Sequence, residues 1–156
     1  MNFMKKIELT EDYITLIHDN KIWSINFNFD GSQTSITPSL VIDIDYVNGS
    51  DSSLDTGDII FHICPAKLNF NGVSSFNIQL SSDREEEAHY KADCLYIYRI
   101  DRALTINNRF YFKIILTDEI GYIELYADNA FLLIEENKIY KIKGCDSIPI
   151  LSRGSI

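Results

Sequence analysis

Long apolar runs and a secretory leader are both missing from this sequence. The most apolar stretch, "FYFKIIL" (110–116), is interrupted by Lys113 and is far shorter than the roughly 20 residues that a membrane-spanning helix needs. The N-terminal segment 1–19 carries Glu11 and Asp12 where a signal peptide has an apolar region. The sequence therefore predicts a soluble cytoplasmic protein with no membrane partner.

Cysteine is scarce, with only three residues at unrelated spacings: Cys64, Cys94 and Cys145. In a reducing compartment we expect them to be buried thiols and not disulfides. His62 and Cys64 would share one face of a strand, and His89 and Cys94 are the candidates to complete a zinc site. Their spacing matches no structural zinc motif, so we expect ordinary packing and no zinc.

Positive charge is also in short supply. The net charge is −9 and the isoelectric point is about 4.7, so the chain would repel nucleic acid and anionic membranes. From residue 22 to residue 66 there is no Lys or Arg, whereas that stretch holds six aspartates and so carries a charge of −6. An acidic region of this kind predicts either a surface that attracts a basic protein or a set of solvated loops.

The acidic stretch "DIDYVNGSDSSLDTGD" (43–58) does not fit a calcium-binding EF-hand loop. Such a loop needs oxygen ligands at positions 1, 3 and 5 and glycine at position 6. With Gly57 at position 6, Leu54 falls on a ligand position, and with Gly49 there, Ile44 does. We therefore expect no calcium site.

Motifs for catalysis or cofactor binding are missing as well. There is no nucleophile elbow, phosphate-binding loop, dinucleotide fingerprint or metalloprotease helix. His18 and Asp19 are adjacent, and adjacent side chains seldom orient one another. The sequence predicts a protein that is not an enzyme and holds no cofactor.

Short β signals fill the chain. In "IWSINFNFDG" the apolar residues from Trp23 to Phe29 alternate with polar ones, and Asp30-Gly31 suits a tight turn. "DIIFHIC" (58–64) is apolar at every position but the first and His62, as expected of a central strand. Further strands are expected at 94–100, 109–117, 121–127, 131–134 and 138–143.

The stretch "KLNFNGVSSFNIQL" (67–80) predicts a hairpin. Asn71-Gly72 is a preferred turn pair for two antiparallel strands, with Leu68 and Phe70 before it and Phe76, Ile78 and Leu80 after it. Helix signals are few. Thr10 is expected to cap a short helix reaching to Asp19, and segment 82–93 is expected to be a loop or a single turn.

These patterns predict one all-β domain over residues 1–156. Its fold would be an antiparallel β-sandwich or barrel of about nine strands, with at most one short N-terminal helix. At this length the chain buries enough surface to need no disulfide or metal.

Five aspartates are the candidate partner-binding residues: Asp43, Asp45, Asp51, Asp55 and Asp58. Asp43 and Asp45 are expected on the outward face of their strand, and the other three follow in a polar loop. Together they would form an acidic face that attracts a basic protein.

A ligand-binding β-domain is the alternative. Aromatic side chains could line a cavity or cover a sheet face, and the candidates are Trp23, Tyr96, Tyr98, Tyr111, Tyr122 and Tyr126. This alternative would bind a small molecule or a carbohydrate.

The segments "LIHDNKIWSINFNFDG", "SLVIDIDYV", "CPAKLNFNGVSSFNIQL" and "GYIELYADNAFLL" resemble a broad group of small bacterial all-β proteins. Several members of that group are regarded as immunity proteins that bind and neutralise polymorphic toxins. The resemblance covers roughly residues 16 to 133 and implies an interaction role, here with a basic toxin. It transfers no binding or catalytic residues.

Overall fold

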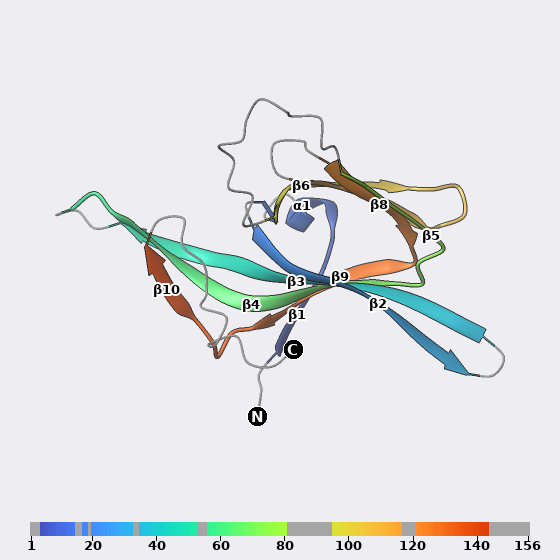
Figure 1. Cartoon of the computed structure of the whole chain (residues 1–156), viewed down its shortest axis with the longest axis horizontal. Coiled ribbons are helices and arrows are strands. Elements are labelled where there is room, and N and C mark those ends of the chain that lie inside the picture. Colours follow the sequence, from blue (N-terminus) through green and yellow to red (C-terminus); the bar gives the residue numbers. More distant parts are fainter. Residues whose placement is uncertain are drawn as a thin grey trace.

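The computed structural model describes residues 4–14, 17–18, 20–32, 35–52, 56–80, 95–116 and 121–143 (Figure 1). In chain order the elements are β1 (Met4–Glu8), α1 (Glu11–Ile14), β2 (Asn20–Ser32), β3 (Ser35–Ser52), β4 (Ile59–Asn71), β5 (Ser75–Leu80), β6 (Leu95–Leu104), β7 (Phe110–Leu116), β8 (Gly121–Ala127), β9 (Asn129–Glu135) and β10 (Tyr140–Lys143). The predicted all-β antiparallel class is confirmed, with ten strands among these residues in place of about nine.

The predicted N-terminal helix is present as α1 and is only four residues long. The Thr10 carbonyl accepts hydrogen bonds from the backbone N–H groups of Tyr13 (3.1 Å) and Ile14 (3.0 Å). Acidic residues occupy its first turn, where they favour the helix N-terminus. The helix ends at Ile14, whose side chain is buried, and Asp19, the predicted end, lies outside the described residues together with segment 82–93.

The strands form one hydrogen-bonded antiparallel sheet. Its order is β1-β9-β4-β3-β2-β6-β7-β8-β5, and β10 pairs with β4 beside β9. The sheet folds over on itself, so that in Figure 1 an upper layer containing β6, β8 and β5 lies above a lower layer containing β1, β9, β4, β3 and β2. β7 belongs to the upper layer because it pairs with both β6 and β8. Within the described residues no helix is long and apolar enough to span a membrane.

The core lies between the two layers. The Phe70 ring of β4 meets the Phe112 ring of β7 nearly edge-on, with the ring centroids 5.0 Å apart. Fully buried side chains from both layers surround this contact: Leu40, Ile42, Ile44, Leu68, Ile114, Ile123 and Leu125. Burying each such side chain contributes about 1.5–3 kcal/mol, so the apolar alternation fixes which face of every strand points inward.

β4 is the central strand that the pattern of residues 58–64 predicted, and it continues without a break to Asn71. β3 pairs along one of its edges, and β10 followed by β9 pairs along the other. Pro65 has no N–H to donate, and it lies where that second edge passes from β10 to β9.

The hairpin predicted over residues 67–80 is wrong. Gly72 has the positive φ of 64° that a turn requires, yet β4 and β5 do not pair with each other. Because β3 and β9 already occupy both edges of this part of β4, β5 pairs with β8 instead. The turn is a corner that carries the chain from the lower to the upper layer. Ile78 and Leu80, which follow the turn, are therefore exposed at the edge of the upper layer.

A second corner, at Asp128 between β8 and β9, lies beside the first. The Asp128 N–H donates a hydrogen bond to the Asn71 carbonyl (2.8 Å). The Asp128 carboxylate lies so close to Gly72 that a Cβ there would overlap it. Arg109 Nε is 3.5 Å from the same carboxylate, and the Arg109 guanidinium also donates to the Gly72 carbonyl. The two corners are thus held together by backbone and side-chain contacts.

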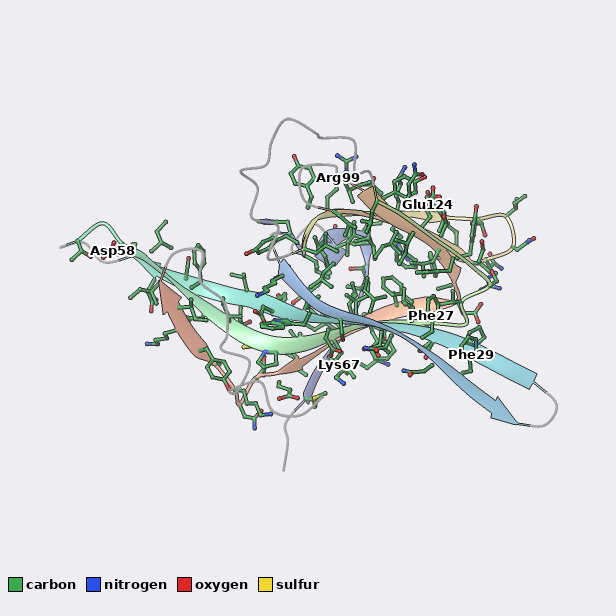
Figure 2. All side chains as sticks on the ribbon, viewed as in Figure 1. Phe27, Phe29, Asp58, Lys67, Arg99 and Glu124 are labelled. Carbon is green, nitrogen blue, oxygen red and sulfur yellow. The ribbon has the colours of Figure 1, made fainter. Side chains whose placement is uncertain are left out.

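The β2–β3 hairpin is confirmed, but its turn lies beyond the predicted Asp30-Gly31. Both residues are inside the ladder, which continues past them. The hairpin therefore projects beyond β4, whose pairing with β3 ends opposite Ser39. Phe29 is 69% exposed on this projecting part, next to the exposed Phe27 (Figure 2). The distal part of the predicted apolar face is therefore in solvent.

Replacing Gly72 with alanine should destabilise the fold more than the same change at Gly57. Both glycines have positive φ, which costs an alanine about 1–2 kcal/mol. A Cβ at Gly57 meets nothing within 4 Å, whereas at Gly72 it would displace Asp128 from Arg109. We expect Gly72→Ala to lower the free energy of unfolding by about 1 kcal/mol more than Gly57→Ala in urea denaturation. Equal losses would contradict this account of the corner.

Candidate functional site

Two of the five aspartates predicted to bind a partner are buried. Asp43 and Asp45 are each 3% exposed, so the prediction that they point into solvent is wrong. β3 lies between β2 and β4, and the residues opposite Asp43 on those strands are Ser24 and Lys67. Alternation placed both aspartates correctly on the side away from the core. It did not reveal that neighbouring strands cover that side.

Asp43 is held by its neighbours on both strands. The Ser24 hydroxyl donates to Asp43 Oδ2 (2.5 Å) and accepts from the Asn26 side-chain amide (2.9 Å). Lys67 Nζ is 3.8 Å from the other carboxylate oxygen. A buried carboxylate is costly unless it is hydrogen-bonded and paired, and this one is both. Asp43 therefore stabilises the lower layer.

The other three predicted aspartates are not all described. Asp51 is at the outer end of β3, and its side chain is 60% exposed. Its Oδ2 lies 2.8 Å from His62 Nε2, and Lys141 of β10 is opposite His62 on the other side. Asp58 is half-buried just before β4, and Asp55 lies outside the described residues. Among the described residues, the acidic groups at this end of the β3–β4 hairpin are the exposed Asp51 and the half-buried Asp58.

The residues considered for zinc do not gather into a metal site within the described part of the chain. His62 contacts Asp51, and Cys64 is fully buried, as predicted for a packed thiol. Burial raises the pKa of the Cys64 thiol. His89 and Cys94 lie outside the described residues, and among those described no group of three or more His, Cys, Asp or Glu side chains is placed to hold a metal.

The upper layer presents a second candidate surface on the side away from the core, where Figure 2 shows Arg99 and Glu124. Residues that lie opposite one another on β6, β7, β8 and β5 form three rows across it. The rows are Arg99, Ile115, Tyr122 and Gln79; then Asp101, Lys113, Glu124 and Asn77; then Ala103, Tyr111, Tyr126 and Ser75. We call these residues the tyrosine face.

Hydrogen bonds fix two of the tyrosine hydroxyls on this face. The Tyr111 hydroxyl donates to Glu124 Oε1 (2.7 Å), and the Tyr122 hydroxyl donates to Gln79 Oε1 (2.5 Å). Burial and the bond to Glu124 raise the pKa of Tyr111 to about 12. The bond from Tyr111 also lowers the pKa of Glu124. At neutral pH the pair is therefore a protonated phenol bonded to a charged carboxylate.

The rings on the tyrosine face pack against one another and against cations. Tyr111 and Tyr126 have ring centroids 5.3 Å apart and planes tilted by 54°. Lys113 Nζ lies 4.4 Å from the centre of the Tyr122 ring. Arg99 Nε is 3.2 Å from Asp101 Oδ1 at the β6 side. These contacts hold the side chains in defined positions on the outer side of the upper layer.

Sequence reasoning missed this face as a site. Tyr111, Tyr122 and Tyr126 are predicted to line a cavity or to cover a sheet face, and they cover the outer face of β7 and β8. Their grouping with charged and amide residues was not predicted, because alternation along one strand does not show which strands will be neighbours. The signal was present in "RFYFKIILT" and "GYIELYA", where polar and aromatic residues alternate with the core residues. Comparisons of the chain with models of protein families, with characterised proteins and with solved structures give no match.

Asp43 and Asp51 should respond differently to the same substitution. Asp43→Ala leaves the Ser24 hydroxyl and Lys67 without their buried acceptor, which costs about 1–3 kcal/mol. Asp51→Ala removes only a solvent-exposed pair with His62, which contributes about 1 kcal/mol or less. Urea denaturation of both variants measures the difference. If Asp43→Ala is as stable as the parent protein, Asp43 is not a structural residue.

Proposed function

We propose that this chain is a non-enzymatic protein-binding domain and that the tyrosine face is its contact surface. The observation that carries the proposal is the set of three tyrosines held among amides and paired charges across four neighbouring strands. Tyrosine and arginine are enriched where proteins bind one another. A sheet surface of this composition suits a folded partner.

The side chains of the tyrosine face are ordered in advance of binding. Tyr111 and Tyr122 already donate hydrogen bonds to Glu124 and Gln79. Binding loses affinity when flexible side chains must be immobilised, at about 0.5–1.5 kcal/mol each. Side chains that are already fixed avoid part of this cost, which favours recognition by this surface.

The tyrosine face carries no net charge although the chain carries −9. Arg99 and Lys113 contribute two positive charges, and Asp101 and Glu124 contribute two negative charges, so the sum is zero. The charge that keeps the protein soluble is thus located elsewhere. A neutral surface places no excess of like charge against a partner that docks on it, while the net charge of the chain still acts at longer range.

A carbohydrate ligand, the alternative, fits this face less well. Sugars stack flat on open aromatic rings, whereas the Lys113 ammonium group lies over the Tyr122 ring. Tyr111 and Tyr126 are tilted by 54° and do not form a common plane. Aromatic rings that carry hydroxyls, together with the amides of Asn77 and Gln79, favour a protein partner.

The resemblance to immunity proteins supplies a class for the partner. We propose a toxin protein met in the cytoplasm, where Cys64 stays a reduced thiol. A basic toxin would be drawn to this acidic chain, and Asp51 and Asp58 at the end of the β3–β4 hairpin would contribute to that attraction. In this proposal the aspartates speed the encounter and the tyrosine face holds the complex.

Removing two rings from the tyrosine face should weaken the complex. The full chain is used as bait in a lysate of its native cells, and the captured protein is identified, purified and titrated against the variants. We expect Tyr111→Ala with Tyr126→Ala to raise the dissociation constant about thirtyfold or more, as loss of a central aromatic contact does. The change should appear mainly in the dissociation rate.

The matched control removes an aromatic–cation contact from the other layer. Phe131 of β9 has Lys6 Nζ 4.3 Å from its ring centre, and Phe131→Ala should leave binding unchanged. The proposal fails if the double tyrosine variant binds like the parent protein, or if Phe131→Ala weakens binding equally. If the parent protein binds a polysaccharide and no protein, and the double tyrosine variant no longer binds that polysaccharide, the carbohydrate alternative is supported instead.

Neutralising Asp51 and Asp58 should slow association without loosening the complex. Asp51→Asn with Asp58→Asn removes two charges from the hairpin end, so the association rate at low salt should fall and depend less on salt. Stopped-flow measurements with the purified partner test this. Glu8→Gln with Glu11→Gln removes the same charge elsewhere and should have a smaller effect. Equal effects from both pairs would show that only net charge matters.

A further inference from the structure

The open edge of β5 lacks the features that normally protect an edge strand. Within the part of the chain that the structure describes, β5 pairs with β8 on one side and with no strand on the other. Its sequence, SFNIQL, contains no charged residue and no proline. Edge strands usually carry such residues because they discourage pairing with another chain. The backbone donors and acceptors along this edge therefore form a template for a further strand.

Exposed apolar side chains line the same edge. Ile78 is 41% exposed and Leu80 is 59% exposed on the core side of β5. The Phe27 ring of the projecting β2–β3 hairpin meets the Phe76 ring of β5 nearly edge-on at 4.3 Å and stacks with Phe29 at 6.4 Å. The apolar surface thus extends from β5 to the hairpin (Figure 2). Such a surface beside an open strand edge favours a strand-pairing interface.

The sequence of β5 is complementary to itself in antiparallel pairing. With a twofold axis at Ile78, this residue lies opposite the same residue of a second copy. Phe76 then lies opposite Leu80, and Asn77 lies opposite Gln79. Apolar side chains meet on the core side of the ribbon and amides meet on the outer side, as cross-strand pairs require. We propose that the chain forms a twofold dimer through β5 in this register.

Charge explains why a second copy meets the chain at this strand. Two copies with a net charge of −9 repel each other over most of their surfaces. β5 has no charged side chain, so two copies of it approach without placing like charges opposite one another. The interface thus combines an open ladder, matched side chains and freedom from local repulsion.

The dimer does not require the function proposed for the tyrosine face, although Asn77 and Gln79 belong to both surfaces. Antiparallel pairing within one sheet requires a twofold axis perpendicular to that sheet, so the outer sides of both upper layers point the same way. The rings of Tyr111, Tyr122 and Tyr126 stay uncovered in each copy. The dimer can therefore exist whether or not that face binds a protein.

The test measures the oligomeric state of the full chain by analytical ultracentrifugation from low to high micromolar concentration. Two double variants change the same exposed residues. Asn77→Lys with Gln79→Lys places lysine opposite lysine at two positions of the interface. Asn77→Lys with Gln79→Glu places lysine opposite glutamate at both positions. We expect the parent protein and the Lys/Glu variant to dimerise, and the dissociation constant of the Lys/Lys variant to rise about tenfold or more.

Circular dichroism and melting temperature establish that both variants are folded. Ile78→Lys provides a second probe, because it places two lysines directly opposite each other on the axis, and it should give a monomer. The proposal is overturned if the parent protein is monomeric throughout the concentration range. It is also overturned if the Lys/Lys variant dimerises as tightly as the Lys/Glu variant, or if the parent forms mixed complexes with another protein through β5 but no dimer.

Discussion

The hydrogen bond from the Asp128 N–H to the Asn71 carbonyl holds two corners of the chain side by side, and both layers of the fold depend on this contact. Below it, β4 pairs with β9; above it, β5 pairs with β8. β4 continues past this contact into β5, and β8 continues into β9, so the same two chain segments are paired in both layers and bend once between them. Gly72 permits the bend because it adopts a positive φ and leaves room for the Asp128 side chain.

The bend also decides which surfaces are left for binding. Because β4 is paired on both edges, β5 is displaced to the edge of the upper layer. The pairing of β8 with β5 and β7 then brings residues from distant parts of the sequence into the rows of the tyrosine face. In the lower layer, the central place of β3 buries Asp43 between Ser24 and Lys67. One topology thus exposes the tyrosines and covers two aspartates.

Local sequence patterns predicted the strands of this fold well, but they predicted poorly which strands pair with one another in the sheet. Alternation and short apolar runs identified the strands other than β1, the central character of β4 and inward residues such as Phe112 and Ile114. The preferred turn pair Asn71-Gly72 predicted a change of direction but not the strand that would follow it, because a type of turn does not specify a sheet partner. Asp43 was assigned to the correct side of its strand, yet its burial depends on Lys67, which no local pattern connects to it. Tyr111 and Glu124 come together for the same reason, through a register that only the folded chain shows.

The pairing of β9 also constrains how the chain can fold. β1 lies at the start of the chain and β4 near its middle, yet both pair with β9, which begins only at Asn129. Closing such long loops costs conformational entropy before the contacts form, so folding of this topology should be slow relative to a helical domain of equal length. During synthesis, one edge of β4 remains unpaired until β9 has been made, when most of the chain is already outside the ribosome. An apolar central strand with an open edge in that interval makes the nascent chain a natural client for chaperones.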